Sequence, residues 1–158
     1  MTDSTLVRDS SAGMSSSAVR DFTRFAEADP PVSASHNVTA DSLRKLAAAI
    51  EAVAPSGTVA GMDVGLRADE IRQRADSLQR DPSSLTHARQ TREAFLLAAT
   101  VLQQVQEARY PDMTDETRQV MDAAKGLKAD ADLLDQTPQV RQFFTSAATA
   151  LRGMAPTS

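Results

Sequence analysis

The chain has 158 residues, 41% of them hydrophobic and 24% charged, which suits one globular domain with a buried core. Its formal net charge of −4 argues against binding to nucleic acid or an acidic membrane surface, because both need clustered Lys and Arg. The absence of cysteine excludes disulfides, thiolate metal sites and cysteine nucleophiles. Aromatic residues make up 4%, so the core must be built from aliphatic side chains and alanine, which favours closely packed helices.

The N-terminal residues 1–38 differ from the rest of the chain. They are rich in serine, contain no lysine and include the helix-breaking pair Pro30-Pro31. We therefore predict a mostly disordered, flexible arm with a short helix over 17–28, where Val19 and Phe22 begin a hydrophobic stripe. The remainder, 39–154, is expected to form a single helical-bundle domain.

Five segments of this domain carry hydrophobic residues three or four positions apart, which is the period of a helix with one buried face. The first three stripes are Leu43, Leu46, Ala47, Ile50 and Val53; Val64, Ala68, Ile71, Ala75 and Leu78; and Leu85, Ala88, Phe95, Ala99 and Leu102. The last two are Val120, Ala124, Leu127, Ala131 and Leu134; and Val140, Phe143, Phe144, Ala147, Leu151 and Met154. No window alternates with a period of two, so we predict no strand.

The stretch 56–66 separates the first two helices of the domain. Glycine recurs in it at every fourth position, at Gly57, Gly61 and Gly65. The stretch lacks the Gly-Lys-Ser/Thr ending of a phosphate-binding loop, so we expect a mobile connecting loop. Met62 and Val64 are the residues of this loop that we expect to contact a binding partner.

Two stretches resemble each other and indicate an internal repeat. Residues 92–102 share with residues 141–151 an Arg, a Phe, an Ala-Ala-Thr run and a Leu in the same positions. We infer two similar helical hairpins, 63–109 and 115–154, that pack as an antiparallel four-helix bundle. The helix over 39–54 would be a fifth member or a cap. The alternative is that alanine-rich amphipathic helices resemble one another by chance.

Each copy of the repeat begins with an arginine, Arg92 or Arg141. Because a guanidinium binds planar anions through two hydrogen bonds, the pair is a candidate for anion or partner contact. The alternative is that each arginine ties its own hairpin together, through an ion pair or a helix-end carbonyl.

The sequence offers little material for a metal or catalytic centre. The two histidines, His36 and His87, could form a metal site only with acidic residues from elsewhere. There is no Glu-x-x-His motif, and the acidic group Asp130, Asp132 and Asp135 lacks the Gly and Glu of a calcium-binding loop. We therefore predict no catalytic residues, no metal ligands and no cofactor.

These observations favour a non-enzymatic helical interaction module, an adaptor, scaffold or secretion-associated protein, that binds another protein or itself. The alternative is a small-ligand or metal-binding bundle that uses His36 and His87, or a cavity near Phe95, Phe143 and Phe144. The chain lacks both an apolar signal segment and a run long enough to cross a membrane. We expect it to be cytoplasmic, unless it is exported by a route that needs no signal peptide. Its excess of Arg over Lys suits a bacterial gene.

Overall fold

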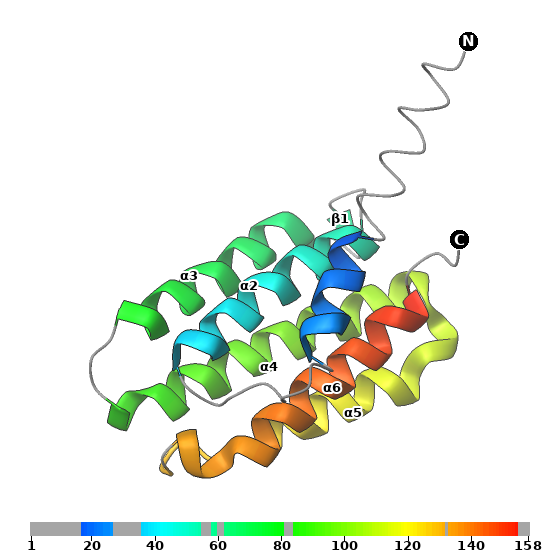
Figure 1. The fold of residues 1–158 in the computed structure, drawn as a ribbon. Coiled ribbons are helices and arrows are strands. Elements are labelled where there is room, and N and C mark those ends of the chain that lie inside the picture. The colour runs from blue at the N-terminus through cyan, green and yellow to red at the C-terminus, as the bar shows by residue number, and fades with distance from the viewer. Residues whose placement is uncertain are drawn as a thin grey trace.

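The computed structural model describes residues 17–26, 36–54, 58–59, 62–80, 84–131 and 133–154 (Figure 1). After a helix over 17–26, the elements are α2 (His36–Val53), β1 (Thr58–Val59), β2 (Met62–Asp63), α3 (Val64–Arg80), α4 (Ser84–Arg109), the 3₁₀ helix η1 (Pro111–Met113), α5 (Thr114–Gly126), the 3₁₀ helix η2 (Leu133–Gln136) and α6 (Thr137–Met154). The predicted all-α class is confirmed.

Consecutive long helices run antiparallel, and α3–α4 and α5–α6 form the two predicted hairpins (Figure 1). The hairpins join through α4, which packs along α5. The helix α2 is a full member of the bundle, because it packs along α3 and also contacts α4 and α6. The prediction of four to five helices therefore holds, with α2 as the fifth.

The core is built from the predicted stripes. All five residues of the α3 stripe are buried, and so are all six residues of the α6 stripe. Two positions of the α3 stripe are alanines, Ala68 and Ala75, and small side chains let α3 approach its neighbours closely. The largest fully buried side chains are phenylalanines, leucines and isoleucines, each of which contributes about 1.5–3 kcal/mol through loss of hydrated apolar surface.

Ion pairs at the edge of this core join α2 to α3. Arg44 on α2 pairs with Asp76 on α3 at 2.7 Å, and Arg72 on α3 pairs with Glu51 on α2. Burial acts to lower the pKa of Arg72, but hydrogen bonds and charge attraction from Glu51 and Asp69 outweigh it, so the pKa is raised. These contacts link α2 and α3 along the rim of the core.

The helix over 17–26, assigned by sequence to the N-terminal arm, packs on the bundle. Phe22 is fully buried and lies in the same hydrophobic cluster as the residues of α2 to α6. The ammonium of Lys45 on α2 lies 5.4 Å from the centre of the Phe25 ring. This segment therefore shares one core with the helices of 39–154. Residues 1–16 and 27–35 of the predicted arm lie outside the described residues.

The prediction of no strand is wrong at one place. Thr58 pairs with Asp63 and Val59 with Met62, so β1 and β2 form a two-stranded antiparallel hairpin within the predicted loop. Strands of two residues are too short to give an alternating pattern. Asp63 then caps α3, since its Oδ1 accepts a hydrogen bond from the Leu66 backbone N–H at 3.1 Å.

The fourth predicted helix is shorter than its hydrophobic stripe. Helix α5 ends at Gly126, and Leu127 is extended with φ −76° and ψ 131°. The stripe continues past this point because Leu127 still packs into the core, 1% exposed, from a non-helical backbone. The spacing of hydrophobic residues reports burial but does not show where the helix ends. The prediction of one helix through Leu134 is therefore wrong.

Candidate functional site

Helix α5 lies between two surface grooves. The α5–α6 groove has a volume of about 390 Å³ and is lined by Gln119, Asp122, Ala123, Gly126, Gln139 and Gln142. The α4–α5 groove has a volume of about 320 Å³ and is lined by Gln103, Gln106, Glu107, Thr114, Thr117, Arg118, Met121, Asp122 and Lys125. Asp122 lines both grooves and so stands on the ridge between them.

The α5–α6 groove combines small side chains with amides. Ala123 and Gly126 are its smallest lining residues, while Gln119, Gln139 and Gln142 each contribute a carboxamide that can donate and accept hydrogen bonds. A Cβ added at Gly126 would meet nothing within 4 Å, so the chain's own packing does not require the glycine. Among the described residues that line this groove, Asp122 is the titratable one. The lining therefore offers mainly hydrogen-bond donors and acceptors.

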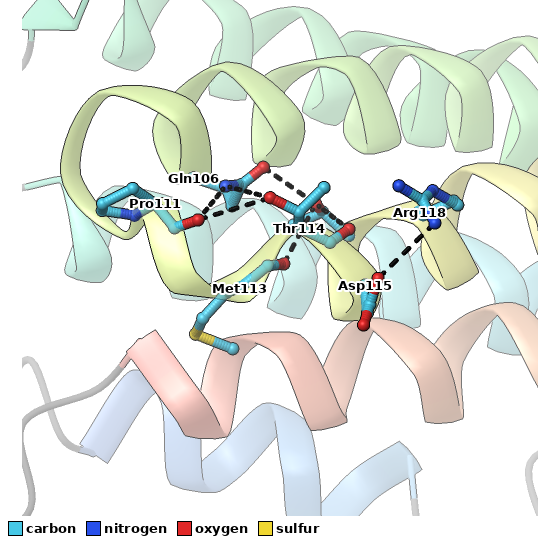
Figure 2. Close-up of polar contacts among 7 residues, drawn as sticks. Gln106, Pro111, Met113, Thr114, Asp115 and Arg118 are labelled. Carbon is cyan, nitrogen blue, oxygen red and sulfur yellow. Dashed lines mark hydrogen bonds and ion pairs between the residues drawn. The ribbon is translucent and has the colours of Figure 1, made fainter.

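The end of the α4–α5 groove is fixed by a buried amide, Gln106 (Figure 2). Its Oε1 accepts a hydrogen bond from Thr117 Oγ1 at 3.1 Å. Its Nε2 donates to the Tyr110 carbonyl at 3.2 Å and to Thr114 Oγ1 at 3.3 Å. Both Gln106 and Thr117 are 2% exposed, and a buried polar group must be paired in this way to avoid a desolvation cost. The network holds the turn from α4 through η1 into α5.

Tyr110 connects this turn to the end of α2. Its hydroxyl donates to the Val53 carbonyl at the end of α2, with an O–O distance of 2.9 Å. The start of α5 is therefore held from both α4 and α2.

The ridge of α5 carries charged side chains that point to solvent. Asp115, Arg118, Asp122 and Lys125 are all exposed. Arg118 pairs with Asp115 at 3.5 Å (Figure 2), but both side chains are mostly exposed, at 65% and 82%, where such a pair contributes little. Within the described part of the chain, neither Asp122 nor Lys125 has an ion-pair partner.

Arg92, a predicted contact residue, is bonded to a backbone carbonyl. Its Nε donates to the Leu127 carbonyl at 2.9 Å, at the point where α5 has ended. The bond corresponds to the alternative in which the arginine binds a helix-end carbonyl. It joins the hairpin 63–109 to the hairpin 115–154, however, and does not tie one hairpin together. Gln136 braces the same connection, since its Oε1 accepts from the Lys128 N–H at 2.6 Å and its Nε2 donates to the Lys128 carbonyl at 2.8 Å.

The other predicted contact residues lie on separate elements. Val64 begins α3 and is fully buried, and Arg141 is exposed on α6. Met62 lies in β2, and its side chain is outside the described residues. Among the large hydrophobic residues that the structure describes, Leu66 is the exposed one, at 57%. The four predicted residues thus do not define one surface, and the grooves beside α5 were not foreseen.

The sequence offered two alternative sites, a metal site with the two histidines and a cavity near three phenylalanines. His87 is buried on α4, and the side chain of His36 is outside the described residues. In the described ranges no three His, Asp or Glu side chains gather closely enough to hold a metal ion. The phenylalanines are packed ring to ring: Phe95 stacks on Phe143 with 3.8 Å between centroids, and Phe144 meets Phe95 edge-on at 5.1 Å. Neither groove beside α5 is lined by these rings.

No protein-family model, curated protein or solved structure matches the chain. None of the helices described is long and apolar enough to cross a membrane. The function must therefore be argued from the chain's own residues.

Proposed function

We propose that the protein is a non-enzymatic helical interaction module, with the exposed side of α5 and its two grooves as the docking surface. The observation that carries this proposal is the α5–α6 groove, which combines small residues with three carboxamides and the carboxylate of Asp122. Small residues allow a partner's backbone to approach closely, and the carboxamides can pair with its peptide groups.

The composition of the surface also indicates the kind of complex. Permanent interfaces resemble a domain core, but among the large hydrophobic side chains of the described residues Leu66 alone is mostly exposed, while Leu96, Leu97, Met113 and Met121 are partly buried. Leu66 lies on α3, away from the lining of either groove. The proposed contact is therefore polar and reversible rather than obligate.

Site-specific photo-crosslinking in the host cell tests the surface. A photoreactive residue at Gln119, in the α5–α6 groove, is expected to give a protein adduct. The same residue at Gln73, on the exposed side of α3, serves as the matched control. Gly126→Tyr places a large side chain in the groove, at a position where a Cβ meets nothing within 4 Å. It should abolish the adduct from position 119 and leave the circular-dichroism spectrum unchanged.

Equal adducts from positions 119 and 73 would contradict the proposal. An adduct at position 119 that survives Gly126→Tyr would contradict it as well, because crosslinking would then not depend on an open groove.

A further inference from the structure

The exposed charges along α5 form a pattern with its own symmetry. Val120 is the midpoint of two pairs of opposite charge, Asp115 with Lys125 and Arg118 with Asp122. All four side chains are exposed and lie three or four residues apart, which places them on one stripe of the helix. Asp112, just before α5, and Lys128, just after it, are also exposed and share the same midpoint.

We propose that this stripe binds the same stripe of a second copy of the chain, with the two α5 helices antiparallel. The inference rests on the proposed docking surface and names its occupant. A twofold axis through the level of Val120 would set each Asp115 against a partner Lys125 and each Arg118 against a partner Asp122. An isologous dimer requires such a self-complementary patch. Antiparallel packing also sets the opposite ends of the two helix dipoles against each other.

The α5–α6 groove provides a place on the surface for the α5 helix of the second copy. Packed helices approach to about 8–10 Å between axes, and small residues permit the shorter distances. Ala123 and Gly126 flank the charged stripe on the side of α6, so the ridge of one α5 can settle into the α5–α6 groove of the other. Asp122 lines that groove as well, which brings the carboxylate to the place where a second Arg118 would enter.

The groups involved are available for this contact. In the part of the chain that the structure describes, Asp122 and Lys125 have no ion-pair partner. The Arg118–Asp115 pair is highly exposed and is readily exchanged for a pair with a second chain. Since the attraction is between exposed charges, the dimer is expected to be weak and sensitive to salt.

Sedimentation velocity of the full chain over a range of concentrations tests the inference. At low salt a monomer–dimer equilibrium is expected, and raising the ionic strength to about 0.5 M should weaken dimerisation by about tenfold or more. Arg118→Asp alone and Asp122→Arg alone each set like charges against each other, so each variant should be monomeric. An equimolar mixture of the two variants restores both opposite-charge pairs and should form a heterodimer.

Arg89→Asp provides the matched control, because Arg89 is an exposed arginine on α4 that lines a groove on the α3 side. It should dimerise like the wild type. A monomer under all conditions overturns the inference, as does a dimer that persists in both single variants or a mixture that stays monomeric. If the chain is monomeric but position 119 still crosslinks to a different protein, the proposed docking surface survives while self-association is excluded.

Discussion

The rings of Phe22 and Phe144 meet edge-on, with 6.2 Å between their centroids and 65° between their planes. Phe22 belongs to the helix over 17–26 and Phe144 to α6, so the contact joins the first described helix to the last. Both side chains are fully buried. Edge-to-face rings add a specific contact to the burial of a large apolar surface, which makes the N-terminal helix part of the folding unit.

Replacing Phe22 by alanine should therefore destabilise the whole protein, by about 3–5 kcal/mol, because the change leaves a cavity beside Phe144. Urea denaturation followed by circular dichroism measures the loss. Asp21→Ala is the control, since Asp21 is exposed on the same helix and should change stability by about 0.5 kcal/mol or less. An equally small effect of Phe22→Ala would mean that the helix over 17–26 does not contribute to the stability of the bundle.

Arg92 links α4 to the segment after α5 through the Leu127 carbonyl. Arg92→Gln removes this charge-assisted hydrogen bond and should destabilise the protein by about 1.5–3 kcal/mol. Arg92→Lys should rescue little, because an ammonium cannot reproduce the direction of the Nε–H. Arg141→Ala, at the corresponding position of the suggested repeat, should cost less than Arg92→Gln, by about 1 kcal/mol or more, since Arg141 is exposed and interactions of exposed charges contribute little. Equal losses at positions 92 and 141 would contradict this assignment.

Much of the fold was predictable because hydrophobic spacing reports which side of a helix is buried. The stripe from Val64 to Leu78 needed no further information, and every member is buried as predicted. The N-terminal helix was harder to place. Its serine-rich surroundings and Pro30-Pro31 suggested an arm, and its place in the bundle depends on tertiary contacts such as Phe22 on Phe144 and Lys45 over Phe25.

The candidate site was much less predictable, because grooves arise where helices from distant parts of the chain meet. Nothing in the local sequence places Gln119 of α5 opposite Gln139 and Gln142 of α6. The charges of α5 were visible in the sequence, and the stripe with Val120 and Ala124 indicated which side of the helix is buried, but the helices that border the exposed side were not. The sequence did contain a signal for the buried network. Gln106 continues the hydrophobic stripe of Leu102, and Thr117 continues that of Val120. A polar residue in such a stripe is expected to be buried and therefore to need a hydrogen-bond partner.

The Gln106–Thr117 bond should be detected by a double-mutant cycle. Thr117→Val removes the donor to Gln106 Oε1, and Gln106→Leu removes the amide that bridges α4, η1 and α5. Thr117→Val leaves the buried Gln106 Oε1 without its donor. Gln106→Leu removes the donor to the Tyr110 carbonyl, while Thr117 Oγ1 keeps the carbonyls of Met113 and Thr114 as partners. Each single change should cost about 1–3 kcal/mol. The double variant should cost less than the sum of the two, with a coupling energy of about 0.5–3 kcal/mol from chemical denaturation. Strict additivity would show that the two side chains do not stabilise each other.

The glycines at the ends of α5 and α6 should respond differently to alanine. A Cβ at Gly126 meets nothing within 4 Å, so Gly126→Ala should stabilise the protein by about 0.5–1 kcal/mol through reduced unfolded-state entropy. A Cβ at Gly153 would lie 2.3 Å from Met113 Cε and 2.9 Å from its Sδ, so Met113 must move out of its packed position. Because these atoms are the end of a flexible side chain that can shift, Gly153→Ala should gain less stability than Gly126→Ala, by about 1 kcal/mol.

The variant Met113→Ala separates two effects of Gly153→Ala, which are the gain from reduced unfolded-state entropy and the cost of the contact with Met113. With the methionine side chain removed, Gly153→Ala no longer meets an obstacle and should stabilise the helix by about 0.5–1 kcal/mol, as at Gly126. Thermal unfolding of the four combinations at positions 113 and 153 gives the comparison. If Gly153→Ala is equally unfavourable in both backgrounds, contact with Met113 is not what requires glycine there. If it is favourable in both, the methionine yields without cost, and the close packing of η1 on α6 is not specific.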